Sequence, residues 1–234
     1  MALNLPTERS VGQIVIGSAM SISDKTHETS RTSERRADVI RAATKLFLQK
    51  GFAGTSMTML GKAADIQKAT LYHHFSSKEA LFVACVTEGF DAGAEDLKHI
   101  RDDVSLDPTA KLTAAIKSIQ ATILHSDVGR MSPIIAEVAT SLPAVGEQFY
   151  TGFIKRQHDI VDAIIDEGVA AGVFRPRGRE GLRYLIFGPV VTLSLSRQML
   201  MQAQDREALL NERAICDDQI EAILELCVAV PVNT

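Results

Sequence analysis

Apolar residues recur along most of the chain with the period of about 3.6 residues that marks one face of an α-helix. No segment shows the alternation of apolar and polar residues that is typical of a half-buried strand. The pattern predicts helices over residues 33–50, 90–104, 109–125, 134–142, 145–172, 181–202 and 205–230, with breaks at 107–108 and between 127 and 133. We therefore expect an all-α protein.

The predicted helix over residues 33–50 has one apolar stripe, formed by Val39, Ile40, Ala43, Leu46 and Phe47. Gly51 is suited to end it, because glycine readily adopts the left-handed conformation that follows a helix. Residues 1–32 show little periodicity, and we interpret them as a flexible tail. The alternative is an arm that reaches along DNA through Arg31, Arg35 and Arg36.

Residues 55–75 are predicted to form two short helices joined by a tight turn. Their inward-facing apolar residues are Met57, Leu60, Ala64, Ile66, Leu71 and Phe75. Ser56 precedes the first helix as an N-cap, because its hydroxyl can accept a backbone N–H of the first turn. Asp65 stands between the helices, and aspartate tolerates the left-handed backbone that a tight turn requires.

The second short helix has an outward face rich in hydrogen-bond donors and without a carboxylate. Such groups can meet base-edge acceptors and phosphate oxygens in the major groove of DNA. The residues expected to read bases are Gln67, Lys68, Ala69, Thr70 and His73. Those expected to contact phosphates are Ser56, Tyr72, His74 and Lys78.

Ser77 is predicted to cap the next helix, which buries Leu81, Phe82, Cys85 and Val86. A helix N-terminus that carries a lysine, here Lys78, is suited to bind phosphate. This helix continues out of the short-helix region, so it is expected to connect that region mechanically to the rest of the chain.

The run Leu-Tyr-His-His-Phe-Ser-Ser-Lys-Glu-Ala-Leu at residues 71–81 follows the pairs Gly51-Phe52 and Thr55-Ser56. In this order and spacing, residues 33–86 resemble the N-terminal DNA-binding domain of the TetR family of bacterial transcriptional regulators. The resemblance implies a three-helix helix-turn-helix domain in which Tyr72 and Lys78 contact phosphates. The family usually has glycine where Asp65 stands and a small polar residue where Gln67 stands.

Beyond residue 86 the resemblance is only one of layout, since the family's second half is also helical. We therefore expect a flexible tail over residues 1–32, a helix-turn-helix domain over 33–80, and a larger helical ligand-binding and dimerisation domain over 81–234.

The formal net charge of −4 is unevenly distributed along the chain. Residues 33–80 contain eight Lys or Arg and four Asp or Glu, whereas residues 81–234 contain 14 and 22. The positive excess therefore lies on the predicted helix-turn-helix domain, where attraction to phosphate requires it.

The predicted helix over residues 181–202 is apolar on most sides, although Arg183, Pro189 and Arg197 argue against a membrane span. Such a helix is buried between layers or against a partner subunit. With the final helix it can form a four-helix bundle between two subunits, and the resemblance assigns this pair to the dimer interface. The expected interface residues are Val191, Leu195, Ile220, Ile223, Leu224 and Cys227.

The apolar helices also suggest a pocket for a small hydrophobic or amphipathic effector. Its candidate lining residues are Phe90, Met131, Phe149, Phe153, Tyr184 and Phe187. Aromatic and methionine residues at helical spacing are also ordinary core residues. Polar residues that can orient a ligand, or can simply be solvated, are His99, His125, His158 and Arg183.

No enzyme motif of the phosphate-loop, dinucleotide, serine-elbow or zinc-protease kind is found in the sequence, so we expect neither an enzyme nor a cofactor. His73 and His74 are a weak metal pair, because adjacent helical residues point about 100° apart. The three cysteines lack metal spacing and are expected to be buried thiols in a reducing cytoplasm, with a redox-sensing pair as the alternative.

These observations predict a ligand-responsive transcriptional regulator of the cytoplasm that binds double-stranded DNA as a homodimer. A repressor that a hydrophobic effector releases from a palindromic operator is the favoured form. The alternative is a helical small-molecule-binding or interaction protein without DNA binding.

Overall fold

The computed structural model describes residues 20–88, 91–176, 178–201, 203 and 210–228. The chain divides into two units between Asp38 and Val39, and each is described by itself. Within the described ranges every regular element is helical, and the only β-type pairing is an isolated bridge between Phe174 and Val228. The all-α prediction is confirmed.

The helix predicted over residues 33–50 is part of a longer helix, α1 (Met20–Lys50). No Gly or Pro lies between residues 20 and 50, and a nucleated helix gains one hydrogen bond for each residue that extends it. The helix ends as predicted at Gly51, whose φ is +69° and whose N–H donates to Phe47 O over 2.8 Å. The flexibility predicted for residues 1–32 is not tested, and residues 1–19 lie outside the described residues.

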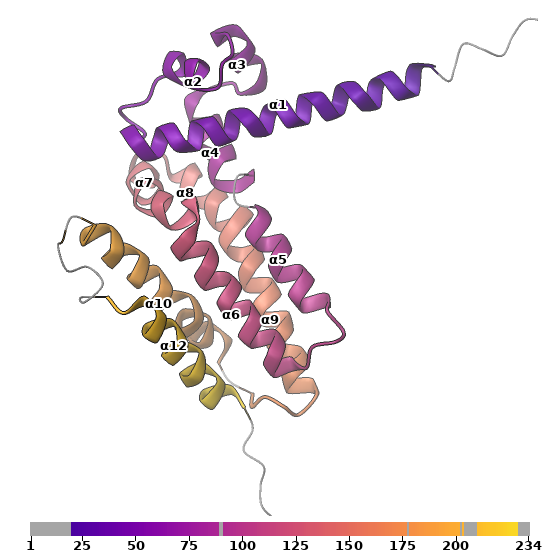
Figure 1. The fold of residues 1–234 in the computed structure, drawn as a ribbon, viewed down its shortest axis with the longest axis vertical. Helices are drawn as coiled ribbons and strands as arrows, with labels where there is room; N and C mark the ends of the chain where they lie inside the picture. The colour runs from indigo at the N-terminus through magenta and orange to yellow at the C-terminus, as the bar shows by residue number, and fades with distance from the viewer. Residues whose placement is uncertain (1–19, 89–90, 177, 202, 204–209, 229–234) are drawn as a thin grey trace, which may run out of the picture. The chain divides into compact units, whose positions relative to one another are not determined.

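The remaining helices follow in chain order (Figure 1). They are α2 (Met57–Ala63), α3 (Lys68–His74), α4 (Lys78–Thr87), α5 (Asp91–Asp102), α6 (Pro108–His125), α7 (Asp127–Ser141), α8 (Pro143–Phe149), the π-helical turn η2 (Tyr150–Ile154), α9 (Lys155–Ala170), α10 (Arg179–Met199) and α12 (Glu212–Cys227). Asp107 caps α6 through its carboxylate, which accepts the Ala110 N–H over 2.8 Å. The break predicted at residues 107–108 is therefore confirmed.

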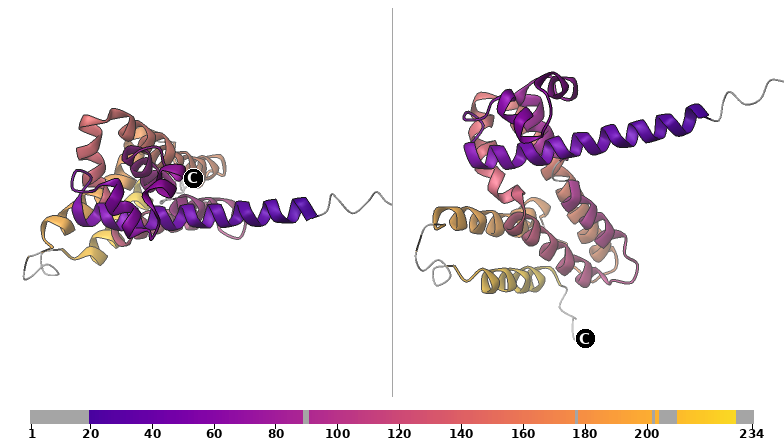
Figure 2. Two further views of the ribbon diagram at one scale, coloured as in Figure 1. Left: turned by 90° about the horizontal axis from the view of Figure 1, so that it is seen from above. Right: turned by 45° about the horizontal axis from the view of Figure 1, so that its top comes forward.

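Two groups of buried side chains form the interior of residues 39–234. The first apolar cluster contains residues of the C-terminal part of α1, of α2 to α4, and of α7, α8 and η2; it includes Phe47, Leu71, Phe82, Met131 and Phe153. The second apolar cluster contains residues of α5, α6, α9, α10 and α12; it includes Ile116, Ile164, Ile186 and Ile223. Helices α10 and α12 lie side by side next to α6 (Figure 2).

The break predicted between residues 127 and 133 is wrong, because α7 begins at Asp127 and continues through Pro133. Proline lacks the N–H that would bond the carbonyl four residues earlier, so Gly129 O has no intrahelical partner from Pro133. The Gln198 side chain of α10 replaces that bond, since its Nε2 donates to Gly129 O over 2.8 Å. A residue distant in sequence therefore allows the helix to tolerate its proline.

The same arrangement recurs in α10, where Pro189 cannot bond Leu185 O. Gln219 of α12 donates its Nε2 to Leu185 O over 3.1 Å and to Ile186 O over 2.7 Å. The Oε1 of Gln219 accepts from Gln120 Nε2 of α6 over 3.1 Å. This buried chain of hydrogen bonds joins α6, α10 and α12 at the position of the proline.

The single helix predicted over residues 145–172 is formed as a continuous run that changes type, from α8 through η2 to α9. The wider π-helical turn was not predicted, because the apolar period of the sequence carries no sign of it. The run ends near the predicted position, with Gly172 at a φ of +71°.

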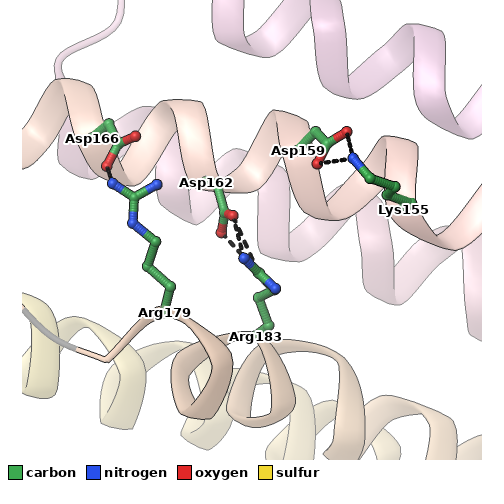
Figure 3. Close-up of polar contacts among 6 residues, drawn as sticks. All are labelled: Lys155, Asp159, Asp162, Asp166, Arg179 and Arg183. Atoms are coloured by element: carbon green, nitrogen blue, oxygen red, sulfur yellow. Dashed lines mark hydrogen bonds and ion pairs between the residues drawn. The ribbon is translucent and has the colours of Figure 1, made fainter.

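Helices α9 and α10 are joined by ion pairs (Figure 3). Arg183 Nε lies 3.1 Å from both carboxylate oxygens of Asp162, and its Nη2 lies 2.7 Å from Oδ2. Arg179 pairs with Asp166 one helical turn away. Arg183, considered above as a residue that orients a ligand, is therefore engaged in holding α10 on α9.

None of the helices in the described ranges carries the long apolar run that crossing a membrane requires. Helix α12 covers residues 212–227 of the predicted 205–230; residues 204–209 and 229–230 lie outside the description. The first apolar cluster contains residues from both sides of the domain boundary predicted at residue 80, and that boundary stays a proposal.

Candidate nucleic-acid interface

Short-range hydrogen bonds shape the two helices predicted to meet DNA. Ser56 caps α2 by accepting the Met59 N–H over 3.3 Å, as predicted. Asp65 adopts a φ of +52°, so the left-handed turn predicted for it is confirmed. The Ile66 N–H donates to Gly61 O over 2.9 Å, and a Cβ at Gly61 would lie only 3.0 Å from Ile66 O. The absence of a side chain at Gly61 thus lets the turn fold back closely onto α2.

Helix α3 buries one face and exposes the other. Leu71 is fully buried and Phe75 is 3% exposed, so both belong to the first apolar cluster. The five residues predicted to read bases are all exposed: Gln67, Lys68, Ala69, Thr70 and His73. The described geometry therefore presents amide, ammonium, hydroxyl and imidazole groups on one short helix, free of carboxylates.

The predicted phosphate contacts are less uniform. Ser56 and Tyr72 are exposed, and Lys68 Nζ lies 5.7 Å from the centre of the Tyr72 ring. His74 is half-buried, with its ring centre 6.4 Å from that of Phe75. Ser77 caps α4 by accepting the Ala80 N–H over 3.1 Å, as predicted.

Lys78 makes contacts that the sequence did not reveal. Its Nζ donates to Phe52 O over 2.9 Å and to Thr55 O over 3.1 Å, and it lies 4.1 Å from the centre of the Phe52 ring. The ammonium group thus fixes the turn between α1 and α2. Its proposed contact with phosphate would have to coexist with this role or replace it.

Residues 39–85 match the family described as "Bacterial regulatory proteins, tetR family". The matched segment contains the C-terminal part of α1, then α2, the turn, α3 and most of α4. Residues 39–85 are therefore a DNA-binding domain of the TetR family. Its exposed α3 is the second helix of that family's helix-turn-helix, and the chain is a DNA-binding transcriptional regulator.

Curated relatives support the same conclusion. The chain is 27% identical over 126 residues to the HTH-type transcriptional repressor DhaR of Mycobacterium sp. strain GP1, covering 51% of this chain and 64% of DhaR. It is 26% identical over 156 residues to the HTH-type transcriptional regulator RutR of Escherichia coli K12, covering 66% of this chain and 71% of RutR. The match thus leaves about a third of each relative uncovered.

Solved structures share the fold over most of the chain. A TetR-family transcriptional regulator from Mesorhizobium loti has a TM-score of 0.70 at 21% identity, with 85% of this chain and 99% of that chain covered. The regulator FadR from Bacillus subtilis, solved with stearoyl-CoA, has a TM-score of 0.66 at 18% identity, covering 81% and 97%. At these identities the likeness concerns the fold alone.

Most of the residues predicted to line an effector pocket lie in or against two different apolar clusters. Met131 is fully buried and Phe149 stacks on Phe153 at 5.3 Å, all within or against the first apolar cluster. Phe187 instead packs against the second cluster, with its ring centre 4.7 Å from that of His158. Tyr184 is 80% exposed on α10. Phe90 lies outside the described residues.

The residues predicted to form the dimer interface differ in how exposed they are within the protomer. Val191 and Leu195 are 40% and 41% exposed on α10, whereas Ile220, Ile223 and Cys227 are buried in the second apolar cluster and Leu224 is half-buried. The strongest apolar stripe of α12 therefore packs within the protomer. The exposed apolar side chains of the two helices are Tyr184, Leu185, Val191, Leu195, Met199, Ile215 and Leu226.

Two further sequence hypotheses concern metals and thiols. The rings of His73 and His74 are centred 5.8 Å apart, and no three metal-ligating side chains gather within the described ranges. Burial raises the pKa of the Cys85 thiol to about 12, so this thiol is a weak nucleophile at neutral pH. Burial also raises the pKa of the half-buried Cys216.

Proposed function

We propose that this chain is a repressor that binds a palindromic DNA site as a homodimer and is released by a hydrophobic small molecule. The observation that carries the DNA-binding part is the exposed, carboxylate-free face of α3 on a buried Leu71–Phe75 base. Residues Gln67, Lys68, Thr70 and His73 read bases, and Ser56, Tyr72, His74 and Lys78 contact phosphates.

Dimerisation follows from the small size of the reading helix. Helix α3 spans residues 68–74, which is enough to contact only a few base pairs, so two copies must address two half-sites related by a two-fold axis. The exposed stripe Tyr184, Val191, Leu195 and Met199 on α10 supplies an apolar face for the partner. A Cβ at Gly188, within this stripe, would meet no atom within 4 Å, so a second helix could approach closely there.

Release by an effector requires that the effector bind the conformation that does not fit DNA more tightly. Helix α4 supports such coupling, because it follows the reading helix directly and packs against α7, α8 and η2. A hydrophobic effector is supported by the apolar composition of both clusters, and the structural neighbour FadR was solved with stearoyl-CoA.

Selection of DNA from a random pool by the purified chain tests the proposal. We expect a palindromic sequence, bound with a dissociation constant of about 10⁻⁸ to 10⁻¹¹ M. A gel-shift measurement with the selected DNA should show one complex that contains two copies of the chain. Failure of the pool to converge would refute the DNA-binding proposal and favour the alternative of a helical small-molecule-binding protein.

The dimer is tested separately by placing a charge in the exposed stripe. Leu195→Glu should give a monomer by sedimentation and lower the affinity for the palindrome, because a carboxylate in an apolar interface is not paired. Val104→Glu is the matched control, since Val104 is 97% exposed beyond the end of α5. A wild-type chain that sediments as a monomer at the concentrations that bind DNA would refute the two-fold model.

A further inference from the structure

Gln157 lies between the two apolar clusters. Phe153, about one turn earlier, belongs to the first cluster, and Ile160 and Val161, about one turn later, belong to the second. The side chain of Gln157 itself is buried, with 3% of the residue exposed. Its helix, α9, packs against α5, α6 and η2. The amide group is therefore held at the junction of the two apolar interiors.

The Nε2 of Gln157 has no hydrogen-bond partner among the described residues. A buried donor without an acceptor is unfavourable, and folded proteins keep few such groups. The amide donors of the other buried glutamines in the described residues are engaged: Gln120 donates to Cys216 O and Gln219 Oε1, and Gln219 donates to two carbonyls of α10. Gln157 therefore differs from the other buried glutamines in having a side-chain donor without an acceptor in the described residues.

The helix changes type directly before Gln157. The π-helical turn η2 covers Tyr150–Ile154, and Gly152 lies in it against α4, where a Cβ would meet Thr87 Cγ2 at 3.1 Å. Single π-helical turns inside α-helices are rare and are found frequently at functional sites. Here the turn carries Phe153, which connects the surroundings of Gln157 to the first apolar cluster and so to α4.

We propose that Gln157 is the hydrogen-bond donor of the effector site, and that the effector is an apolar molecule with a neutral carbonyl oxygen that accepts from Nε2. This inference rests on the ligand-responsive function proposed above. The carbonyl satisfies the amide, and the apolar remainder of the molecule lies between the two clusters.

A neutral carbonyl suits this position better than a carboxylate. Burial of a carboxylate is strongly unfavourable unless a positive charge pairs with it, and the amide supplies none. A hydrocarbon without oxygen would gain the apolar contacts but would leave Nε2 unpaired. The chemical class is therefore a ketone, ester, thioester or amide with an apolar body.

Two matched substitutions test the premise before any ligand is added. Gln157→Leu removes an unpaired donor and keeps the volume, so the melting temperature should rise by about 2–4 °C. Gln120→Leu makes the same change at a glutamine that donates two hydrogen bonds and should lower the melting temperature by about 4 °C or more. A fall for Gln157→Leu as large as that for Gln120→Leu would mean that the amide has a partner in the protein, and would overturn the proposal.

The ligand class is tested with acetophenone, ethylbenzene and benzoate, which share a ring and differ in the acceptor. Each is added to the full chain at about 5 mM, the range in which such small molecules bind. With glutamine-selective ¹⁵N labelling, acetophenone alone should shift the side-chain amide resonance that is missing in Gln157→Leu. Acetophenone should also raise the melting temperature of the wild type, and Gln157→Leu should bind it about tenfold more weakly.

The outcomes separate this inference from the proposed function. An unchanged Gln157 resonance with acetophenone, or an equal response to ethylbenzene or benzoate, overturns the assignment of the site or of its ligand class. Gln157→Leu should still bind the selected palindrome, because it leaves α3 untouched. If wild-type chain binds no DNA while acetophenone shifts the Gln157 resonance, the repressor function fails and the ligand site stands.

Discussion

The reading helices and the helical bundle behind them are held together in different ways. In residues 51–80 the decisive hydrogen bonds join positions close in sequence: Ser56 to Met59, Gly61 to Ile66, and Ser77 to Ala80. In the bundle of α6, α7, α10 and α12 they join positions far apart, such as Gln198 to Gly129 and Gln219 to Leu185. The geometry of residues 51–80 is therefore set by short sequence motifs, whereas the geometry of the bundle forms only when its helices pack together.

The difference teaches how the two regions can respond to change. Reading helices that are held by local caps keep their shape when neighbouring helices shift, as a DNA-binding surface requires. In the bundle, the glutamine bond near Pro133 couples two helices, α7 and α10, and the bonds near Pro189 couple three, α6, α10 and α12. Lys78 is the exception in residues 51–80, because its hydrogen bonds join it to Phe52 and Thr55, which lie 26 and 23 residues earlier in the chain.

The largest effect is expected where the bundle depends on one side chain. Gln219→Leu leaves Leu185 O without a donor and removes an acceptor of Gln120, so the free energy of unfolding should fall by about 2–4 kcal/mol. Denaturant unfolding measures it. Gln148→Leu, at an exposed glutamine of α8, is the control and should change stability by no more than about 0.5 kcal/mol.

A double-mutant cycle tests whether Gln198 replaces the bond that Pro133 cannot make. Gln198→Leu alone should lower the free energy of unfolding by about 1–3 kcal/mol, since Gly129 O is left unpaired. In a Pro133→Ala background, the backbone N–H of residue 133 can bond Gly129 O, so the same change should be at least about 1 kcal/mol milder. Equal losses in the two backgrounds would contradict the interpretation.

Lys78→Met tests the one residue of the reading-helix region that was found to make long-range hydrogen bonds. Loss of two charge-assisted bonds to carbonyls should lower the free energy of unfolding by about 1–2 kcal/mol, while the methionine keeps the apolar stem. DNA affinity should fall for all sequences, and the slope of its salt dependence should decrease by about one. A weaker complex with an unchanged salt slope would show that Lys78 acts only by fixing the turn.

The smallest effects on stability are expected on the exposed face of α3. Lys68→Ala and Thr70→Ala should each change the free energy of unfolding by no more than about 0.5 kcal/mol. Each should nevertheless alter sequence preference, by about 1–3 kcal/mol at individual base pairs, in a repeated DNA selection. Lys117→Ala, at an exposed lysine of α6, should alter neither quantity. Uniform loss across all sequences would refute the assignment of Lys68 and Thr70 to base reading.

The sequence alone predicted the features that depend on neighbouring residues. The caps at Ser56 and Ser77, the left-handed turn at Asp65, the end of α1 at Gly51 and the start of α6 after Asp107 are all present. The exposure of Gln67, Lys68, Thr70 and His73 also follows from the apolar period of one helix. Each needs only the identities of residues within a few positions, because caps and tight turns are formed by hydrogen bonds between near neighbours in sequence.

Tertiary structure decided the features in which distant segments compete for the same side chain or carbonyl. Pro133 ended no helix because Gln198 reached its orphaned carbonyl, and Ile220, Ile223 and Cys227 entered the protomer core because α6 and α10 covered them. The unpaired amide of Gln157 likewise arose only when two apolar clusters closed around it. The apolar period of a helix predicts which side chains are buried, whereas only the packed structure shows which helices cover them.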